Sequence, residues 1–497
     1  MELSLAAVLA ETASRTSEDI AVVCGDLRLS YGTLWERARR RAAFLLDRGI
    51  GRGDRVALLM TNTPDFPAAY FGILAAGAAV VPVNILLRAE EIAYVLRDSG
   101  AVALVTEPAL RELATAAADS AGVTLFDDMR GEAGYAIGDY VRTADSDTAV
   151  ILYTSGTTGQ PKGVLLTHAN LVLNITVTML SPFAFTADDV LLGALALHHT
   201  FGQICGMGVC FRAAATLVLM PRFDAVRALE LIATEHCTVF MGVPTMYFAL
   251  LDAVGDDVSV PLSRAYCGGA ALSPQVLQRF RKVFGCEIYE GYGLTETSPV
   301  VAYNDPGAPV KPGTVGRTIW GVRVEIARAD LEHRIELLPD GAVGEIVVRG
   351  HNVMSGYLNR PEATAQVLID GWFRTGDLGR KDADGYLVVV DRKKDMILRG
   401  GYNVYPRELE DVLIDHPLIA QVAVLGIPDE RLGEEVCAVV IPRRGVTPDD
   451  AAADDILAWG RCRLAAYKYP RRVVFVTEFP LGPSGKVLKR ELSALLA

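Results

Sequence analysis

The stretch Thr154-Ser-Gly-Thr-Thr-Gly-Gln-Pro-Lys-Gly163 gathers the residue types that bind a polyphosphate. Glycines let the backbone turn so that several N–H groups point at one anion, and the hydroxyls and Lys162 add donors and a positive charge. A Walker loop has Lys directly after its last glycine, whereas Pro161 intervenes here. The spacing therefore predicts a phosphate loop of another class, against the plainer alternative of a polar surface loop.

A second group of candidate residues lies in Tyr289-Glu-Gly-Tyr-Gly-Leu-Thr-Glu-Thr297. Two glycines flank Tyr292 and leave a flat surface that suits a stacked purine. Glu296 is a carboxylate of the kind that binds Mg²⁺ beside phosphates. The plainer alternative is a strand, a turn and a helix with Thr295 as its N-cap. The glycines of Cys267-Gly-Gly-Ala-Ala-Leu272 likewise permit a ligand to approach closely or simply mark a bend.

Three further candidates come later in the chain. Asp377 follows a glycine and has the geometry to bind a ribose diol, although a surface aspartate in a turn is commoner. Asp391-Arg392 opens a charged run that is either solvated or a hinge whose arginine reaches a sugar phosphate. Lys486 ends a short glycine loop, which is either a surface turn or a way of bringing a cation to a reaction centre.

The elements that must position these residues alternate between short apolar runs and helical patterns. A helix is predicted over Thr33–Asp47, opened by a capping box of Thr33 and Glu36. Alternation of this kind indicates α/β layers with largely parallel sheets. Strands are predicted at Val56–Met60, Ala101–Thr106, Cys237–Met241 and Cys286–Tyr289.

The composition of the sequence changes after about residue 310. From there glycine, proline and short segments with the alternating pattern of strands dominate. A compact α+β pattern then follows the charged run at 391–395, which is expected to lie in a turn. We predict an N-terminal domain over 1–390, made of layered α/β subdomains and a β-rich subdomain. A hinge at 391–392, centred on Asp391, is predicted to join it to a small mobile α+β domain over 393–497.

Length, charge and cysteine use exclude several classes of protein. The chain has 497 residues and a formal net charge of -12, which argues against nucleic acid as a partner. Its eight cysteines form no Cys-x-x-Cys pair, so reduced thiols and a cytoplasmic location are expected.

A membrane-spanning segment is also argued against. The uncharged stretch Phe66–Leu87 is long enough to cross a bilayer, but Pro67, Pro82 and Asn84 interrupt it. We predict a buried helix that runs into a buried strand there, and no stable membrane insertion.

These motifs, in this order, resemble those of the adenylate-forming superfamily, and of its acyl-CoA synthetases in particular. The resemblance runs from Ser30-Tyr-Gly-Thr-Leu34 to Lys486 and so covers essentially the whole chain. It implies ATP, Mg²⁺ and coenzyme A as cofactors. It also implies the catalytic residues Lys486, Thr295, Glu296 and His199, with Glu296 as the metal ligand. The implied nucleotide-binding residues are Thr154, Ser155, Gly156, Thr157, Thr158, Gly159, Lys162, Gly269, Ala270, Tyr289, Glu290, Gly291, Tyr292, Asp377 and Arg392.

The chemistry that the resemblance implies has two steps. A substrate carboxylate attacks the α-phosphorus of ATP, while Mg²⁺, the loop N–H groups and Lys486 stand where negative charge grows. A thiolate then attacks the acyl-adenylate. The C-terminal domain is expected to turn about Asp391 between the steps, bringing Gly400, Gly401 and Tyr402 beside the thiol tunnel. The plainer alternative is that Gly400 and Gly401 are turn residues.

The acid is expected to lie between Leu197–Gly202 and Val239–Met246. His199 matches the histidine of the family's pocket, although a satisfied core histidine is an equal alternative. His198 stands where relatives usually have an aromatic residue, which could reshape the pocket. The Val239–Leu250 segment is most similar to that of fatty-acyl-CoA ligases. The predicted acyl-pocket residues are His198, Phe201, Val239, Met241, Val243 and Met246.

An apolar pocket with neither an Asp nor a second cation predicts a hydrophobic monocarboxylic acid as the small-molecule substrate. The leading hypothesis is an ATP-dependent acyl-CoA ligase. One alternative is an acyl-AMP-forming enzyme that serves a carrier protein, or runs one half-reaction on an aryl or polycyclic acid. A non-catalytic nucleotide-binding regulator is the third.

Overall fold

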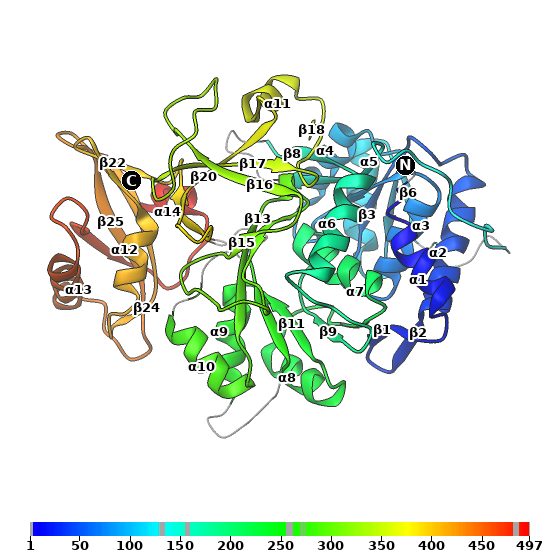
Figure 1. The fold of residues 1–497 in the computed structure, drawn as a ribbon, viewed down its shortest axis with the longest axis horizontal. Helices are drawn as coiled ribbons and strands as arrows, with labels where there is room; N and C mark the ends of the chain where they lie inside the picture. Colours follow the sequence, from blue (N-terminus) through cyan, green and yellow to red (C-terminus); the bar gives the residue numbers. More distant parts are fainter. Residues whose placement is uncertain are drawn as a thin grey trace. The chain divides into compact units, whose positions relative to one another are not determined.

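The computed structural model divides into two compact units, which are described separately. The first unit takes in Met1–Val324 and Val348–Phe373, and the second Glu325–Val347 and Arg374–Ala497. Figure 1 shows the course of the chain. The structure describes residues 3–127, 129, 135–154, 160–254, 262–269, 272, 274–480 and 487–496.

A nine-stranded sheet forms one layer of the first unit, in the order β15-β14-β13-β12-β11-β9-β10-β1-β2. Its six central strands are parallel, and most of their residues are buried, as in sheets that are covered on both faces. The strands predicted near 237 and 286 are present, each beginning two residues later than expected. The bounds are β1 Ile20–Cys24, β2 Leu27–Ser30, β9 Val190–Gly193, β10 Thr216–Leu219, β11 Val239–Gly242, β12 Arg264–Cys267, β13 Ile288–Gly293, β14 Val300–Tyr303 and β15 Arg317–Thr318.

A seven-stranded sheet forms the other layer, in the order β18-β8-β7-β4-β3-β5-β6. Strands β7 and β8 are antiparallel neighbours, and the predicted phosphate loop connects them. The bounds are β3 Arg55–Leu59, β4 Ala79–Pro82, β5 Ala103–Thr106, β6 Thr124–Phe126, β7 Thr148–Thr154, β8 Lys162–Thr167 and β18 Gly356–Tyr357.

Helices cover these sheets, with α4 and α5 on the seven-stranded sheet and α8, α9 and α10 on the nine-stranded one (Figure 1). The stretch after residue 65 is a buried helix followed by a buried strand, as predicted, and no described helix is long and apolar enough to cross a membrane. The bounds are α1 Ala7–Arg15, α2 Tyr31–Leu46, α3 Asp65–Ala75, α4 Ala89–Ser99, η1 Pro108–Leu110, α5 Arg111–Ala121, α6 His168–Leu180, the π-helix η2 Phe201–Gly208, α7 Val209–Arg212, α8 Ala225–Thr234, α9 Pro244–Ala253, α10 Pro274–Phe284, η3 Thr295–Thr297 and α11 Pro361–Val367.

The predicted start of α2 is wrong by about one turn. Ser30 is the N-cap, because its backbone is extended and its hydroxyl accepts a hydrogen bond from the Thr33 N–H. Helix α2 therefore begins at Tyr31, which is fully buried and donates its hydroxyl hydrogen to the Ala215 carbonyl. Ser30 and Thr33 both have a hydroxyl that suits an N-cap. Ser30 is the cap because Tyr31, which follows it, must be in the helix to reach its buried position.

Two five-stranded sheets follow residue 320, in the orders β16-β17-β20-β19 with β21 on β20, and β23-β22-β25-β24 with β26 on β25. The predicted α/β class, with a large N-terminal part and a smaller α+β part after it, is confirmed. The bounds are β16 Val322–Ala327, β17 Gly344–Gly350, β19 Leu368–Ile369, β20 Trp372–Lys381, β21 Leu387–Arg392, β22 Ile397–Arg399, β23 Tyr402–Val404, α12 Pro406–Leu413, β24 Ile419–Asp429, β25 Gly433–Pro442, α13 Asp450–Arg463, β26 Arg472–Phe475 and α14 Lys489–Leu496.

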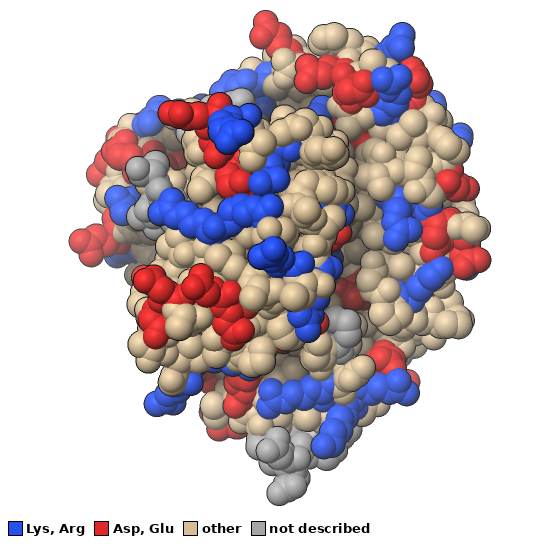
Figure 2. All heavy atoms as spheres, turned by 90° about the vertical axis from the view of Figure 1, so that its left-hand side faces the viewer, with Lys and Arg blue, Asp and Glu red and all other residues tan. Residues whose placement is uncertain are grey.

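The charged run after residue 390 does not lie wholly in a turn. Asp391 and Arg392 end strand β21, and only the next three residues form the turn. The second compact unit also includes Glu325–Val347, so this division differs from the predicted boundary at 390, which stays a prediction. Basic and acidic side chains alternate in small groups on the face that Figure 2 shows, so the net charge is not gathered there into one acidic field.

Candidate functional site

The two stems of the predicted phosphate loop are both fastened to α4. Thr154 ends β7 opposite Lys162, which opens β8. At one stem, the Tyr153 hydroxyl donates to Asp98 (2.8 Å); at the other, the Tyr94 hydroxyl donates to the Pro161 carbonyl (3.0 Å). The described ends of the loop are thus held at a fixed separation. The loop residues Ser155, Gly156, Thr157, Thr158 and Gly159 lie outside the described residues.

Tyr357 brings the phosphate-loop lysine and the candidate metal ligand together. Its hydroxyl donates to Glu296 Oε1 (2.9 Å), and Lys162 Nζ lies 5.2 Å from the centre of its ring. Burial, followed by the charge of Glu296, raises the pKa of Tyr357, so the phenol stays protonated and donates. Tyr357 was not identified as a site residue from the sequence. It lies in the short strand Gly356–Tyr357 beside β8, which belongs to none of the motifs described above.

Glu296 is suited to bind a metal ion whose other ligands are nucleotide phosphates and water. It lies on η3, which Thr295 opens with Leu294 as its N-cap, so the alternative of Thr295 as an N-cap is wrong. Among the described residues, no group of three His, Cys, Asp or Glu side chains could hold a metal by itself. Mg²⁺ usually takes one or two protein carboxylates and completes its shell with substrate phosphates and water, so a single glutamate fits this ion.

The predicted adenine-side residues lie where parallel strands end. The chain leaves β12 through Gly268 and Gly269, and β13 carries Tyr289 to Tyr292 at the same edge. In open α/β sheets ligands bind at this carboxyl edge. A side chain at Gly291 would place its Cβ 2.1 Å from the Tyr303 ring, which explains the glycine. Ala270 lies outside the described residues.

Glu290, which the resemblance placed in the nucleotide site, faces inward. It is 6% exposed, and its carboxylate accepts a hydrogen bond from the Leu272 N–H (2.9 Å) while its carbonyl accepts one from the Asn304 N–H (2.9 Å). The side chain therefore holds the chain after β12 in place, and its predicted nucleotide contact stays a prediction.

A buried polar clamp fixes the loop between β9 and η2, which carries His198 and His199. Asn62 brackets this loop, donating to the Leu195 carbonyl (2.8 Å) and accepting from the Leu197 N–H (3.0 Å). Gln203 donates to the Leu197 carbonyl (3.2 Å). Asn62 and Gln203 are 6% and 0% exposed, so water does not replace these bonds. Gln203 gave no sequence signal beyond being polar in an apolar stretch, and Asn62, in the polar run 61–65, gave none.

The two histidines lie side by side in this loop, with ring centres 4.5 Å apart and planes tilted by 53°. His198 is buried and His199 half-buried. Burial, and then the neighbouring His199, lower the pKa of His198 to about 3. The His198 ring is therefore neutral near pH 7.

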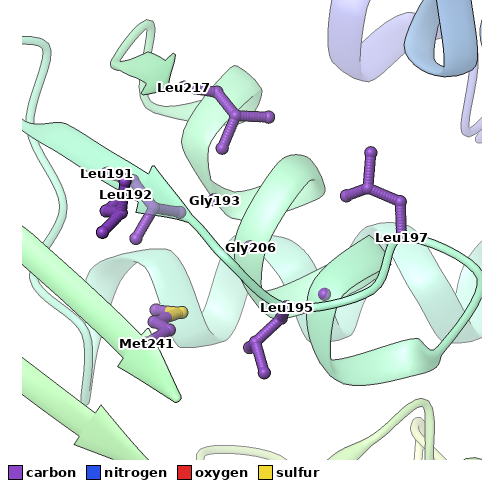
Figure 3. A pocket seen from close by; sticks show the side chains of 9 residues that line it. Leu191, Leu192, Gly193, Leu195, Leu197, Gly206, Leu217 and Met241 are labelled. Carbon is purple, nitrogen blue, oxygen red and sulfur yellow. The ribbon is translucent and has the colours of Figure 1, made fainter. Parts of the chain in front are cut away.

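An apolar cavity lies next to the histidine loop (Figure 3). Its volume is about 10 Å³, near the least that admits one water molecule. Of the predicted acyl-pocket residues, Met241 lines it. Val239 is buried on the same strand, Phe201 lies against Gly268, Val243 caps α9, and Met246 packs against the core around Phe240. The lining residues are Leu191, Leu192, Gly193, Leu195, Leu197, Gly202, Gly206, Leu217 and Met241.

Arg264, which opens strand β12 opposite Val239, is already paired with a carboxylate. Its guanidinium pairs with Asp189 at 2.6 Å, and Thr238 donates to the other oxygen of that carboxylate. Arg264 thus stabilises the start of strand β12 and does not supply a free charge for a second substrate carboxylate.

The candidate residues of the second unit lie on neighbouring strands. Asp377 on β20 and Arg392 on β21 are register partners, with Asp377 Oδ1 and Arg392 Nε 3.2 Å apart. Asp391 accepts hydrogen bonds from the N–H groups of Arg392 (2.7 Å) and Arg407 (3.0 Å), and burial raises its pKa. The predicted hinge residue is thereby tied to the first turn of α12.

Gly400 and Gly401 form the two-residue turn between β22 and β23. Both have positive φ, +57° and +84°, as a tight hairpin turn requires. Tyr402 follows; its ring stacks on that of Tyr467 at 4.7 Å, and the residue is 57% exposed. Gly400 and Gly401 are therefore turn residues, which was the plainer of the two alternatives. Their place beside a thiol tunnel stays a prediction. Lys486 lies outside the described residues.

Comparisons with known proteins match residues 9–358 to the AMP-binding enzyme family and residues 408–486 to the AMP-binding enzyme C-terminal domain. A long-chain-fatty-acid–CoA ligase of Bacillus subtilis (strain 168) is 34% identical over 98% of this chain and 94% of its own. A feruloyl-CoA synthase of Amycolatopsis sp is 39% identical over 95% of each chain. The structure of ATP-bound MatB from Rhodopseudomonas palustris, 32% identical, matches 100% of this chain and 99% of its own with a TM-score of 0.91.

Proposed function

Because this chain belongs to the AMP-binding enzyme family and is an AMP-forming acyl-CoA ligase, we propose that it activates a monocarboxylic acid with a hydrophobic body. The observation that carries this proposal is the apolar wall beside the histidine loop, which Leu195, Leu197 and Met241 share. The pairing of Arg264 with Asp189 supports one substrate carboxylate rather than two, because that cation is already neutralised. The names of the fatty-acid and feruloyl relatives agree with such an acid.

The first step uses the residues around the phosphate loop. Thr154–Gly159 and Lys162 bind the β- and γ-phosphates of ATP, and Tyr357 contacts Lys162 with its ring and Glu296 with its hydroxyl. Glu296 is the proposed ligand of Mg²⁺, which when bound neutralises charge on the phosphates. Tyr289 to Tyr292 and Gly269 border the adenine. Asp377 and Arg392, paired with each other in this structure, are proposed to take the ribose.

In the second step a thiolate attacks the acyl carbon of the acyl-adenylate, forms the thioester bond and displaces AMP, the pyrophosphate having left in the first step. The C-terminal domain is proposed to turn about Asp391, which exchanges Lys486 for the hairpin at Gly400-Gly401. That turn would have to break or carry along the two backbone hydrogen bonds that Asp391 accepts. Coenzyme A is the proposed thiol, because residues 408–486 match the AMP-binding enzyme C-terminal domain and the relatives are CoA ligases.

A panel of acids tests this function when the two half-reactions are scored separately. The purified protein is given ATP, Mg²⁺, CoA and straight-chain, aryl and polycyclic monocarboxylic acids. We expect acid-dependent pyrophosphate release and acyl-CoA formation with hydrophobic acids, and neither with dicarboxylic acids of equal length. Pyrophosphate release without thioester would favour a carrier protein as the acceptor. The absence of both products with every acid would refute the ligase assignment and favour a regulator.

A further inference from the structure

His198 has a buried ring nitrogen whose hydrogen-bonding capacity is unused. The residue is 6% exposed, and its Nε2 has no hydrogen-bond partner among the described residues. Most buried polar atoms in proteins have a partner, because burying one without a partner is unfavourable. An unpartnered atom of this kind, in a binding region, indicates a place that a ligand fills.

The surrounding loop prevents His198 from finding a partner by moving. Asn62 holds the backbone at Leu195 and Leu197, and Gln203 holds Leu197 a second time. On the far side, η2 begins directly, and the Phe201 ring lies against Gly268. A displacement of the loop would break buried hydrogen bonds, so the position of His198 is imposed by the fold.

The loop that carries His198 lies at the edge of the sheet where open α/β folds bind their ligands. The loop leaves β9 at the carboxyl edge of the parallel strands, beside the ends of β11 and β12. Leu195 and Leu197, on the same loop, line the apolar cavity. His198 follows Leu197 on this loop and stands where the family pattern has an aromatic residue, although it is not itself among the residues that line the cavity.

We propose that His198 is a substrate-binding residue whose Nε2 hydrogen-bonds a hydroxyl group on the body of the acid, so that this ligase prefers hydroxylated acids over the matching plain ones. The inference rests on the proposed function, which supplies the acid. A hydroxyl fits because it both donates and accepts, and therefore complements either tautomer of a neutral imidazole. Sites built around a substrate hydroxyl reject the analogue that lacks it, because the protein group is then left unpaired.

Pairs of acids that differ by one hydroxyl test the proposal. The probes are 4-hydroxycinnamate with cinnamate, and 12-hydroxydodecanoate with dodecanoate, and kcat/KM for CoA thioester formation is measured for each. For at least one pair we expect the wild type to favour the hydroxylated acid by about tenfold or more. His198→Phe should abolish this preference by losing rate only with the hydroxylated acid. His198→Gln, which keeps an amide nitrogen near the Nε2 position, should retain part of it.

Three results would overturn the inference. The same hydroxyl preference in wild type and His198→Phe would refute it while leaving the ligase function intact. A wild type that favours the plain acid in both pairs would do the same. Turnover of none of the acids, and of none in the wider panel, would remove the proposed function and this inference with it. Thermal melting checks that the variants fold. If His198→Phe does not fold, His198→Ala takes its place, with the same expected loss of the hydroxyl preference.

Discussion

Two glycines of the π-helix η2 should respond in opposite ways to the addition of one methyl group. At Gly202 a Cβ would lie 2.4 Å from the Ala196 carbonyl oxygen and 3.0 Å from that of Leu195. At Gly206 the nearest atoms would be 3.8 and 3.9 Å away, which is ordinary contact. Gly202→Ala and Gly206→Ala are therefore a matched pair, with the same chemical change four residues apart on one element.

The magnitude for Gly202→Ala follows from what the methyl group meets. Its neighbours are backbone atoms, which cannot rotate away, and they belong to the loop that Asn62 and Gln203 hold. Overpacking costs about 1–3 kcal/mol, and each hydrogen bond lost as the loop shifts costs about 1 kcal/mol more. We expect the free energy of unfolding to fall by about 2–4 kcal/mol.

Gly206→Ala should leave stability unchanged or raise it slightly. Alanine is favoured over glycine in a helix interior by up to about 1 kcal/mol, and the added methyl group meets no atom at a repulsive distance. The apolar cavity that Gly206 lines has room for about one water molecule, so an acid that extends into it must displace its walls, and the methyl group should make that harder. We expect kcat/KM to fall by about tenfold for the bulkiest acid accepted and little for smaller ones.

Urea unfolding, followed by circular dichroism, gives the stability of both variants beside the wild type, and the acid panel gives kcat/KM. The close approach of Gly202 to the loop would be refuted if Gly202→Ala were as stable as Gly206→Ala. The proposal that the body of the acid extends into this cavity would be refuted if Gly206→Ala affected all acids equally.

Three other predictions concern single residues. Lys486→Ala should block acid-dependent pyrophosphate exchange yet spare CoA transfer from a supplied acyl-adenylate, and normal exchange would contradict the role of this lysine. Glu296→Gln should raise the Mg²⁺ concentration needed for half-maximal turnover, because an amide is a weaker ligand than a carboxylate; a titration that overlays the wild type would exclude the ligand role. Burial lowers the pKa of His168 to about 4, and its neutral Nδ1 accepts a hydrogen bond from the Leu5 N–H (3.0 Å). As pH falls from the unfolded pKa near 6.5 towards 4, the folded protein should lose up to about 3 kcal/mol of stability. His168→Asn keeps an acceptor there and does not titrate, so urea unfolding at pH 7.5 and 4.5 should give a smaller loss, and equal losses would contradict the account.

The sequence predicted the type of most elements because hydrophobic spacing is a local property. The strand predicted at Val56–Met60 is found at Arg55–Leu59, and the helix-to-strand passage after residue 65 is present. Element ends were less accurate. Ser30 and Thr33 are both capable caps, and the choice was made by the burial of Tyr31, whose hydroxyl donates to the Ala215 carbonyl 184 positions away.

Candidate groups of the site, whose roles stay predictions, could also be named from the sequence, since the phosphate loop, Glu296 and Lys486 lie in short motifs that resemble those of the family. Their supporting contacts could not. Tyr357 lies 61 positions from Glu296, and Asn62 lies 133 positions from Leu195. No local pattern records such pairs.

What the sequence determined by itself is the class of reaction, because each motif that resembles those of the adenylate-forming superfamily is continuous along the chain. What only the tertiary structure decided is the surroundings of the proposed acid site. Packing places Asn62 and Gln203 around the loop, pairs Arg264 with Asp189, and leaves the His198 nitrogen buried without a partner among the described residues. Each of these outcomes depends on which side chains meet across the sheet, and therefore on the complete fold rather than on any one segment.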